Sequence, residues 1–277
     1  MSICRKRGIA SSLAKWSARR LAEDGEFAGR VRALVVLASL LAGISTSSYA
    51  FQASAGEILN KVSDVYQHMH SYQFVADEIS EVAAVGENRS VGGTVVSNFH
   101  NSTESRIDLS AIMPGKVRLA VKDEKLDIVL ISDGQKIWTY LPKRKRYTEA
   151  MGGLSQATDT FHLVNYWNLI VGRFRGASQM ASIATLEGEG HTKVGRDEVD
   201  CYIIKAQAPE ITHEMWVDKT RFIVLRFKQT PTRPLEGMAL QTTITVNMTV
   251  ANVDANLDDG LFNFAPPPNV TKVASLK

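Results

Sequence analysis

Cysteine is nearly absent from this chain of 277 residues, which has only Cys4 and Cys201. Cys4 falls in an N-terminal segment that we expect to be removed, so a single cysteine remains. One cysteine excludes an internal disulfide and a paired-cysteine metal site, although an exported protein could form disulfides. We interpret Cys201 as a small apolar strand residue rather than a reactive thiol.

Sequence patterns of the common catalytic and metal sites are also missing. No His-x-x-x-His, Gly-x-Ser-x-Gly or phosphate-loop pattern occurs. His68 and His70 are two residues apart, so they point to different sides of a helix and make a poor metal pair. His162, His191 and His213 stand alone and fit surface or core positions. We therefore expect no catalytic residue, no metal, no cofactor and no enzyme activity.

Apolar runs long enough to cross a bilayer, which takes about 20 residues, are lacking. The 12-residue run 33–44 follows a basic segment and precedes Ser48 and Ala50, which form a small-x-small cleavage pattern. We therefore predict a signal peptide over residues 1–50, cut after Ala50, and a mature chain 51–277 that works outside the cytoplasm. Phe51 is not a cysteine, so nothing indicates a lipid-modified N-terminus.

Two alternatives for the leader remain open. Arg19 and Arg20 form a twin-arginine pair, but the apolar run begins 13 residues later. Translation could instead begin at Val31, which would leave a leader of ordinary length. Recovery of peptides from residues 2–30 in cells blocked for signal cleavage would exclude this second start.

A charge excess is lacking once the leader is removed. The whole chain has 32 basic and 29 acidic residues; residues 1–50 hold 8 and 3 of these, which leaves 24 and 26, a net charge of −2. The basic character therefore belongs to the leader and gives no case for nucleic-acid binding.

Hydrophobic periodicity predicts a short helix, many strands, a second helix and further strands. Ser54 and Glu57 form a capping-box pattern, and a helical stripe runs from Ile58 to Met69. A second amphipathic helix is predicted over 159–171. Strand patterns cover 72–76, 91–99, 105–109, 116–121, 127–132, 135–142, 199–207, 212–217, 221–229 and 239–251.

The clearest local signal is Asp133-Gly134 between two β-rich runs, which predicts a hairpin. In its second strand, Trp138 and Tyr140 share one face, and Ile137, Thr139 and Leu141 share the other. About ten strands in one sheet would curl strongly. We therefore expect a mainly β fold, an incomplete, half-open antiparallel β-barrel with amphipathic helices packed over an apolar cavity.

Three stretches in order resemble a known family. MPGKVR at 113–118, ISDGQKIWTYLP at 131–142 and LFNFAPP at 261–267 resemble the strand entry, the hairpin and the C-terminal segment of LolA-like periplasmic lipoprotein carriers and their relatives. The resemblance covers 55–273 and implies the same half-barrel fold with a helical lid. One departure is Met113, where the carriers commonly have a basic residue, and residues 195–202 are closer to the uncharacterised relatives.

The resemblance also implies a function, the binding of acyl chains of lipoproteins or lipids during passage to the outer membrane. It implies an inner-membrane donor complex and an outer-membrane acceptor as partners; we expect a monomer. Large side chains that we expect to line the cavity are Met113, Trp138, Tyr140, Phe161, Trp167, Trp216, Phe222 and Phe227. Each of them could instead fill a solid core.

A basic run just after the hairpin, Lys143, Arg144, Lys145 and Arg146, is either a solvated turn or a docking patch for anionic head groups. Two function classes remain open: a carrier of lipid or lipoprotein, and an envelope sensor or protein-interaction module on the same fold.

Overall fold

The computed structural model describes residues 53–86, 89–91, 94–96, 99–125, 127–152, 165–235 and 238–276. Residues Ala53–Lys277 form one compact unit. The predicted signal peptide, 1–50, lies outside the described residues and stays a prediction.

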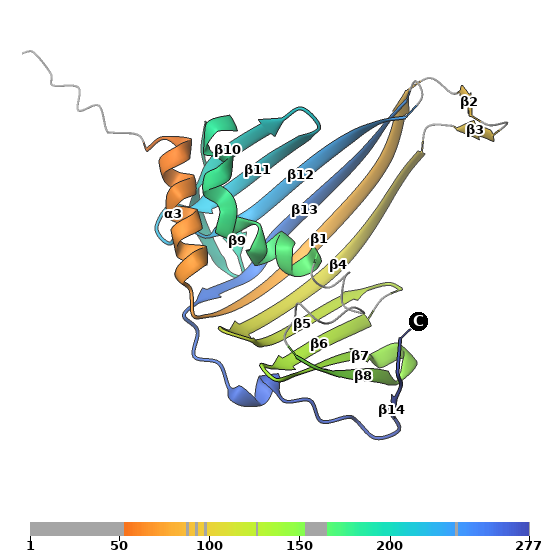
Figure 1. The fold of residues 1–277 in the computed structure, drawn as a ribbon. Coiled ribbons are helices and arrows are strands. Elements are labelled where there is room, and N and C mark those ends of the chain that lie inside the picture. Colours follow the sequence, from red (N-terminus) through yellow and green to blue (C-terminus); the bar gives the residue numbers. More distant parts are fainter. Residues whose placement is uncertain are drawn as a thin grey trace, which may run out of the picture. The chain divides into compact units, whose positions relative to one another are not determined.

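One open sheet of 12 strands dominates this unit, in the order β14-β8-β7-β6-β5-β4-β1-β13-β12-β11-β10-β9 (Figure 1). Its first half comprises β1 (Ser71–Gly86), β4 (Phe99–Ile112), β5 (Lys116–Asp123), β6 (Asp127–Asp133), β7 (Lys136–Leu141) and β8 (Arg146–Met151). Its second half comprises β9 (Ala184–Val194), β10 (Asp197–Ala208), β11 (Ile211–Asp218), β12 (Val224–Leu235) and β13 (Met238–Val253). β14 (Thr271–Lys272) pairs with β8 in parallel, and the other pairs in the sheet are antiparallel. The predicted mainly β, unclosed fold is confirmed.

Beyond the large sheet, β2 (Arg89–Val91) and β3 (Thr94–Val96) form a small two-stranded sheet. The helical elements within the described ranges include α3 (Ala55–His68), η1 (Pro142–Arg144), η4 (Asn168–Gly172), η5 (Phe174–Ile183) and η6 (Asp259–Phe262). Figure 1 shows α3, η4 and η5 on the inner side of the curved sheet.

The first helix forms as its sequence predicts. Ser54 is the N-cap of α3: its hydroxyl accepts a hydrogen bond from the backbone N–H of Glu57, and its own N–H donates to the Glu57 carboxylate. This reciprocal pair satisfies two donors that the first helical turn leaves open. Ile58, Leu59 and Val62 on the predicted stripe are fully buried against the sheet and η5.

The inner face of the sheet is set by strand register. Phe74 of β1 pairs with Leu109 of β4, Leu109 with Leu119 of β5, and Leu119 with Leu130 of β6. Direct partners in neighbouring strands point to the same side of a sheet. All four side chains are buried, so one apolar row runs across four strands on the face that meets the helices.

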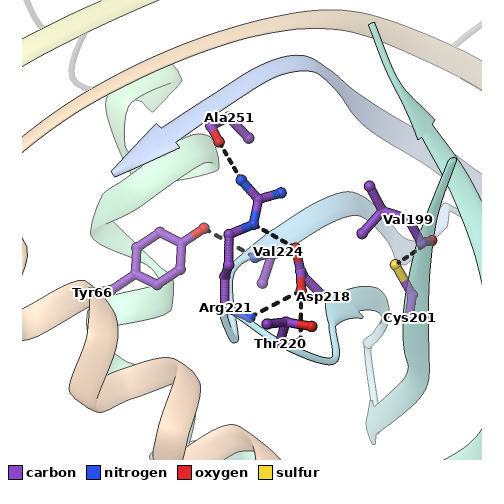
Figure 2. Close-up of polar contacts among 8 residues, drawn as sticks. All are labelled: Tyr66, Val199, Cys201, Asp218, Thr220, Arg221, Val224 and Ala251. Atoms are coloured by element: carbon purple, nitrogen blue, oxygen red, sulfur yellow. Dashed lines mark hydrogen bonds and ion pairs between the residues drawn. The ribbon is translucent and has the colours of Figure 1, made fainter. Parts of the chain in front are cut away.

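A hydrogen-bond network at the turn between β11 and β12 connects this turn to α3 (Figure 2). Asp218 accepts from the backbone N–H of Thr220 and Arg221 and from Nε of Arg221, while an N–H of Arg221 donates to the carbonyl of Ala251 on β13. The backbone N–H of Val224 donates to the hydroxyl of Tyr66 on α3, 3.2 Å away. Contacts at this turn therefore join β11, β12, β13 and α3.

The C-terminal segment crosses the outer face of the sheet. Phe262 is buried, and the ring of Phe264 packs against Trp138, Tyr140 and Tyr147 of β7 and β8. The chain then reaches β14 at the edge of β8. The three prolines at 266–268 do not end strand pairing, because the chain resumes it three residues later.

Several elements differ from the sequence-based expectation. β8 and β9 were not predicted, since β8 begins in a basic run and β9 is rich in glycine and charge. β12 begins at Val224 rather than 221, because Arg221 and Phe222 belong to the turn. Helical structure covers 165–167 and continues through η4 and η5 to Ile183, well beyond the predicted end at 171; the predicted start at 159 lies outside the described residues.

Candidate functional site

The inner face of the sheet is apolar over several neighbouring strands. Its buried members on β1, β4, β5, β6 and β7 are Tyr72, Phe74, Ala76, Ile107, Leu109, Ala111, Val117, Leu119, Val121, Leu130 and Ile137. Towards the far ends of β1 and β13 the same face carries Ile244, which is only half-buried and pairs with Ser80. This face is the candidate binding surface for an apolar ligand.

Four of the predicted cavity residues lie on the helix side of the sheet. Phe227 is buried and packs edge-on against Phe174 of η5. The indole N–H of Trp167 donates to the hydroxyl of Tyr72 at 3.1 Å. Phe222 packs beneath the Lys61 ammonium, and Met113 packs against the buried core.

Three predicted residues lie on the opposite face. Trp138 and Tyr140 alternate with the buried Ile137 and Thr139, so they point away from the helices and contact Phe264. Trp216 likewise alternates with the buried Met215, and the Arg226 guanidinium lies over its ring.

Phe161 lies outside the described residues. The seven described residues lie on two opposite faces and therefore do not form one site. The sequence separates the two faces of β7 correctly. The aromatic face, however, is the outer one, which packs against the C-terminal segment and not against the helices.

The basic run 143–146 is exposed and forms η1 and the start of β8. Nζ of Lys143 donates to the carbonyls of Asp123 and Glu124, at 3.3 and 2.8 Å. The carbonyl of Lys145 accepts from Thr271 of the C-terminal segment. The run is thus a turn that joins three segments, with its side chains at the surface.

A buried carboxyl group interrupts the apolar inner face. Glu78 of β1 is 7% exposed, and its Oε2 has no hydrogen-bond partner among the described residues. Burial, followed by the neighbouring Asp123, raises the pKa of Glu78, while a hydrogen bond from Ser105 opposes the shift. Burial, and then Glu78, also raise the pKa of Tyr166. A raised pKa favours the neutral carboxyl, which an apolar lining tolerates better than a carboxylate.

A second polar group on the inner face involves a helix and two strands. Arg173, between η4 and η5, donates to the side-chain carbonyl of Gln229 on β12 and lies 3.5 Å from Nδ1 of His213 on β11. Its guanidinium also stacks over Phe227 at 4.9 Å. Burial lowers the pKa of Arg173, and burial together with Arg173 lowers the pKa of His213 to about 4.

Sequence reasoning missed this group, because its three polar members come from separate elements. His213 appeared isolated in the sequence, and Gln229 marked only the expected end of a strand. The one available signal was a charge within the predicted apolar stripe: Arg173 and Arg175 flank Phe174 shortly after the apolar residues 169–171.

Two recesses indent this part of the chain. One, of about 980 Å³, lies where β5 ends beside β4, with Glu78, Ser105 and Asp123 among its lining residues. The other, of about 510 Å³, lies beside the junction of η4 and η5 and includes Arg173. Neither is lined by any of the predicted cavity residues.

Within the described ranges, no cluster of three or more His, Cys, Asp or Glu side chains is arranged to hold a metal ion. Over the same ranges, no helix has the length and apolar character needed to cross a bilayer.

Comparison with protein families gives a match over residues 55–276 to a family described as "Predicted periplasmic protein (DUF2092)". The chain belongs to the DUF2092 family. The match confirms the predicted relationship at the level of a periplasmic family. No curated protein matches the chain.

Among solved structures, similarity is found to a DUF1329 family protein from Desulfovibrio piger, with 13% identity and a TM-score of 0.29, over 75% of this chain and 95% of that one. A putative outer membrane lipoprotein-sorting protein domain from Vibrio parahaemolyticus gives 11% identity and a TM-score of 0.29, over 75% and 95%. The Pseudomonas aeruginosa MucA/MucB complex gives 12% identity and a TM-score of 0.36, over 76% of this chain and 60% of that one.

Proposed function

We propose that this DUF2092 protein is a periplasmic carrier that binds acyl chains of lipids or lipoproteins against the inner face of its sheet, without catalysing a reaction. The observation that supports the proposal is the apolar face itself, which continues across β1, β4, β5 and β6 and on to the half-buried Ile244.

The physical case rests on the cost of moving an acyl chain through water. Each exposed methylene costs about 0.8 kcal/mol, so a chain of about 15 methylenes costs on the order of 12 kcal/mol. An apolar protein face that replaces the bilayer removes this cost and leaves transfer between protein and membrane nearly balanced. Such a carrier needs no catalytic group.

A matched pair of isoleucines tests the proposal. Ile244 of β13 lies on the inner face, opposite Ser80 of β1. Ile79, which precedes Ser80 in β1, points to the outer face and is also half-buried. Ile244→Asp should abolish uptake of a fluorescent fatty acid by the full chain recovered from the periplasm, and Ile79→Asp should leave it intact.

Native mass spectrometry of the same preparations, followed by lipid extraction, should find bound acylated species in the parent and in Ile79→Asp. A clean apo mass with no uptake by the parent, or equal binding by both variants, would refute the carrier.

One observation favours the alternative function, a protein-interaction module. β5 ends at Asp123, opposite Ser105, so residues 99–104 of β4 have β1 as their sole strand partner among the described strands. Such an edge can accept an added strand from a partner. A photocrosslinking residue at Asn101 should then give an adduct of defined mass in cells, and one at the exposed Asp200, inside a strand pair, should not.

A further inference from the structure

Arg173 carries a positive charge and has no acidic partner among the described residues. The guanidinium is partly buried between the ring of Phe227 and the polar side chains of Gln229 and His213. Among the residues that the structure describes, no carboxylate forms an ion pair with it. Charged groups withdrawn from water are usually paired, because their desolvation is otherwise uncompensated.

The neighbours of Arg173 position it without neutralising it. The amide of Gln229 is neutral and offers its carbonyl oxygen as an acceptor. The ring of His213 is also neutral at neutral pH, because burial and the nearby guanidinium lower its pKa to about 4. Two neutral acceptors fix the direction of the guanidinium, and its charge stays available to a ligand.

The adjoining recess has the composition of a site for an anionic group. Its 510 Å³ are lined by Asn168, Gly172, Arg173, Gly176, Gln179 and Met180. The two amides and the guanidinium can donate hydrogen bonds, and the methionine gives an adaptable apolar wall. The side chains of Asn168 and Trp167 pack closely over Gly172, so this glycine allows their close approach.

We propose that this recess binds the oxyanion headgroup, phosphate or carboxylate, of an acylated amphiphile. The inference rests on the proposed carrier function and narrows it from acyl chains in general to anionic ones. η4 and η5 lie on the inner side of the sheet, so a headgroup held at Arg173 leaves its acyl chain beside the apolar face.

The test compares ligands that share a tail and differ in the headgroup. Myristoyl lysophosphatidate, myristate and monomyristoylglycerol are titrated into the full chain from the periplasmic fraction by calorimetry, with inorganic phosphate and glycerol 3-phosphate as tail-free probes. We expect both anionic amphiphiles to bind about tenfold or more tightly than the neutral one, the effect of one hydrogen bond to a charged group.

Variants assign the preference to Arg173. Arg173→Gln should abolish the preference for anionic headgroups and leave the affinity for monomyristoylglycerol unchanged, and Arg173→Lys should restore part of it. Arg118→Gln, a half-buried arginine on the outer face of β5, is the matched control and should behave as the parent. Thermal unfolding of each variant checks that the fold is retained.

The remaining outcomes overturn the inference in distinguishable ways. Equal binding of the anionic and neutral amphiphiles would refute the headgroup site and leave the carrier standing. Tail-free phosphate that binds as tightly as lysophosphatidate would make this a site for a soluble anion. Absence of binding by all three amphiphiles would refute the carrier as well. A preference that persists in Arg173→Gln would place the headgroup elsewhere.

Discussion

Replacement of Asp218 by alanine should destabilise the fold more than any surface change, because this carboxylate organises the turn between β11 and β12. Its side chain is 3% exposed and pairs with Arg221 at 2.6 Å. It also accepts the backbone N–H groups of Thr220 and Arg221, at 2.7 and 2.9 Å. The change leaves three donors without their acceptor (Figure 2).

The magnitude follows from the burial of each donor. Breaking a fully buried ion pair by removing one partner costs about 3–5 kcal/mol. The side chain of Arg221 is 36% exposed and keeps its bond to the Ala251 carbonyl, so water can solvate part of the charge. We therefore expect a loss near the lower end, about 3 kcal/mol, or roughly 6–12 °C in Tm for a unit of this size.

Urea unfolding of four proteins measures this: the parent, Asp218→Ala, Arg221→Met and the double variant. Both single changes break the same pair. The loss of unfolding free energy in the double variant should therefore be about 1–3 kcal/mol smaller than the sum of the two single losses. Additive losses, or a loss below about 0.5 kcal/mol for Asp218→Ala, typical of surface sites, would refute this account of the turn.

Three further predictions concern the outer face, the Arg173 group and the basic run. Phe264→Ala should cost about 1–2 kcal/mol, since the ring is partly exposed, and hydrogen exchange should increase in the C-terminal segment and not in β1; unchanged exchange there would contradict the packing on Trp138. Burial and the nearby Arg173 lower the pKa of His213 from 6.5 to about 4, so its contribution to stability is full above pH 6.5 and is lost as the pH falls through 4. His213→Asn should therefore flatten the pH dependence of unfolding between 6.5 and 4, and an identical profile would exclude this burial. Serine at all four positions 143–146 should weaken binding to anionic vesicles at low salt, whereas serine at Lys193 and Arg196 should not; equal binding by both variants would leave the run a solvated turn.

Local chemistry was readable from the sequence where neighbouring residues decide it. The capping box at Ser54, the hairpin at Asp133-Gly134 and the alternation along β7 all formed as predicted. The strand patterns in the last third gave β10, β11 and β13 with small errors at their ends. These features depend on backbone preferences and on a side-chain period, which a short window contains.

A short sequence window could not show which face of the sheet is the inner one. Trp138 and Tyr140 are the largest apolar residues of the hairpin, so size alone favoured them for a cavity. Their place is decided by Phe264, more than 120 residues away in the chain, which covers them on the outer face. A period of two shows that a strand has two faces, but only packing between distant segments shows which face is buried under helices.

The sequence by itself determined an export signal as an expectation, a mainly β class and the first helix, because composition and local periodicity carry them. The family relationship came from the resemblance of three short stretches to a known family. The tertiary structure alone decided the polar contacts between segments that are distant in the chain. It brings Arg173, His213 and Gln229 together from a helix and two strands, and it leaves the guanidinium without an acidic partner among the described residues. Burial and the distance between charges depend on the folded chain, so no spacing in the sequence encodes them.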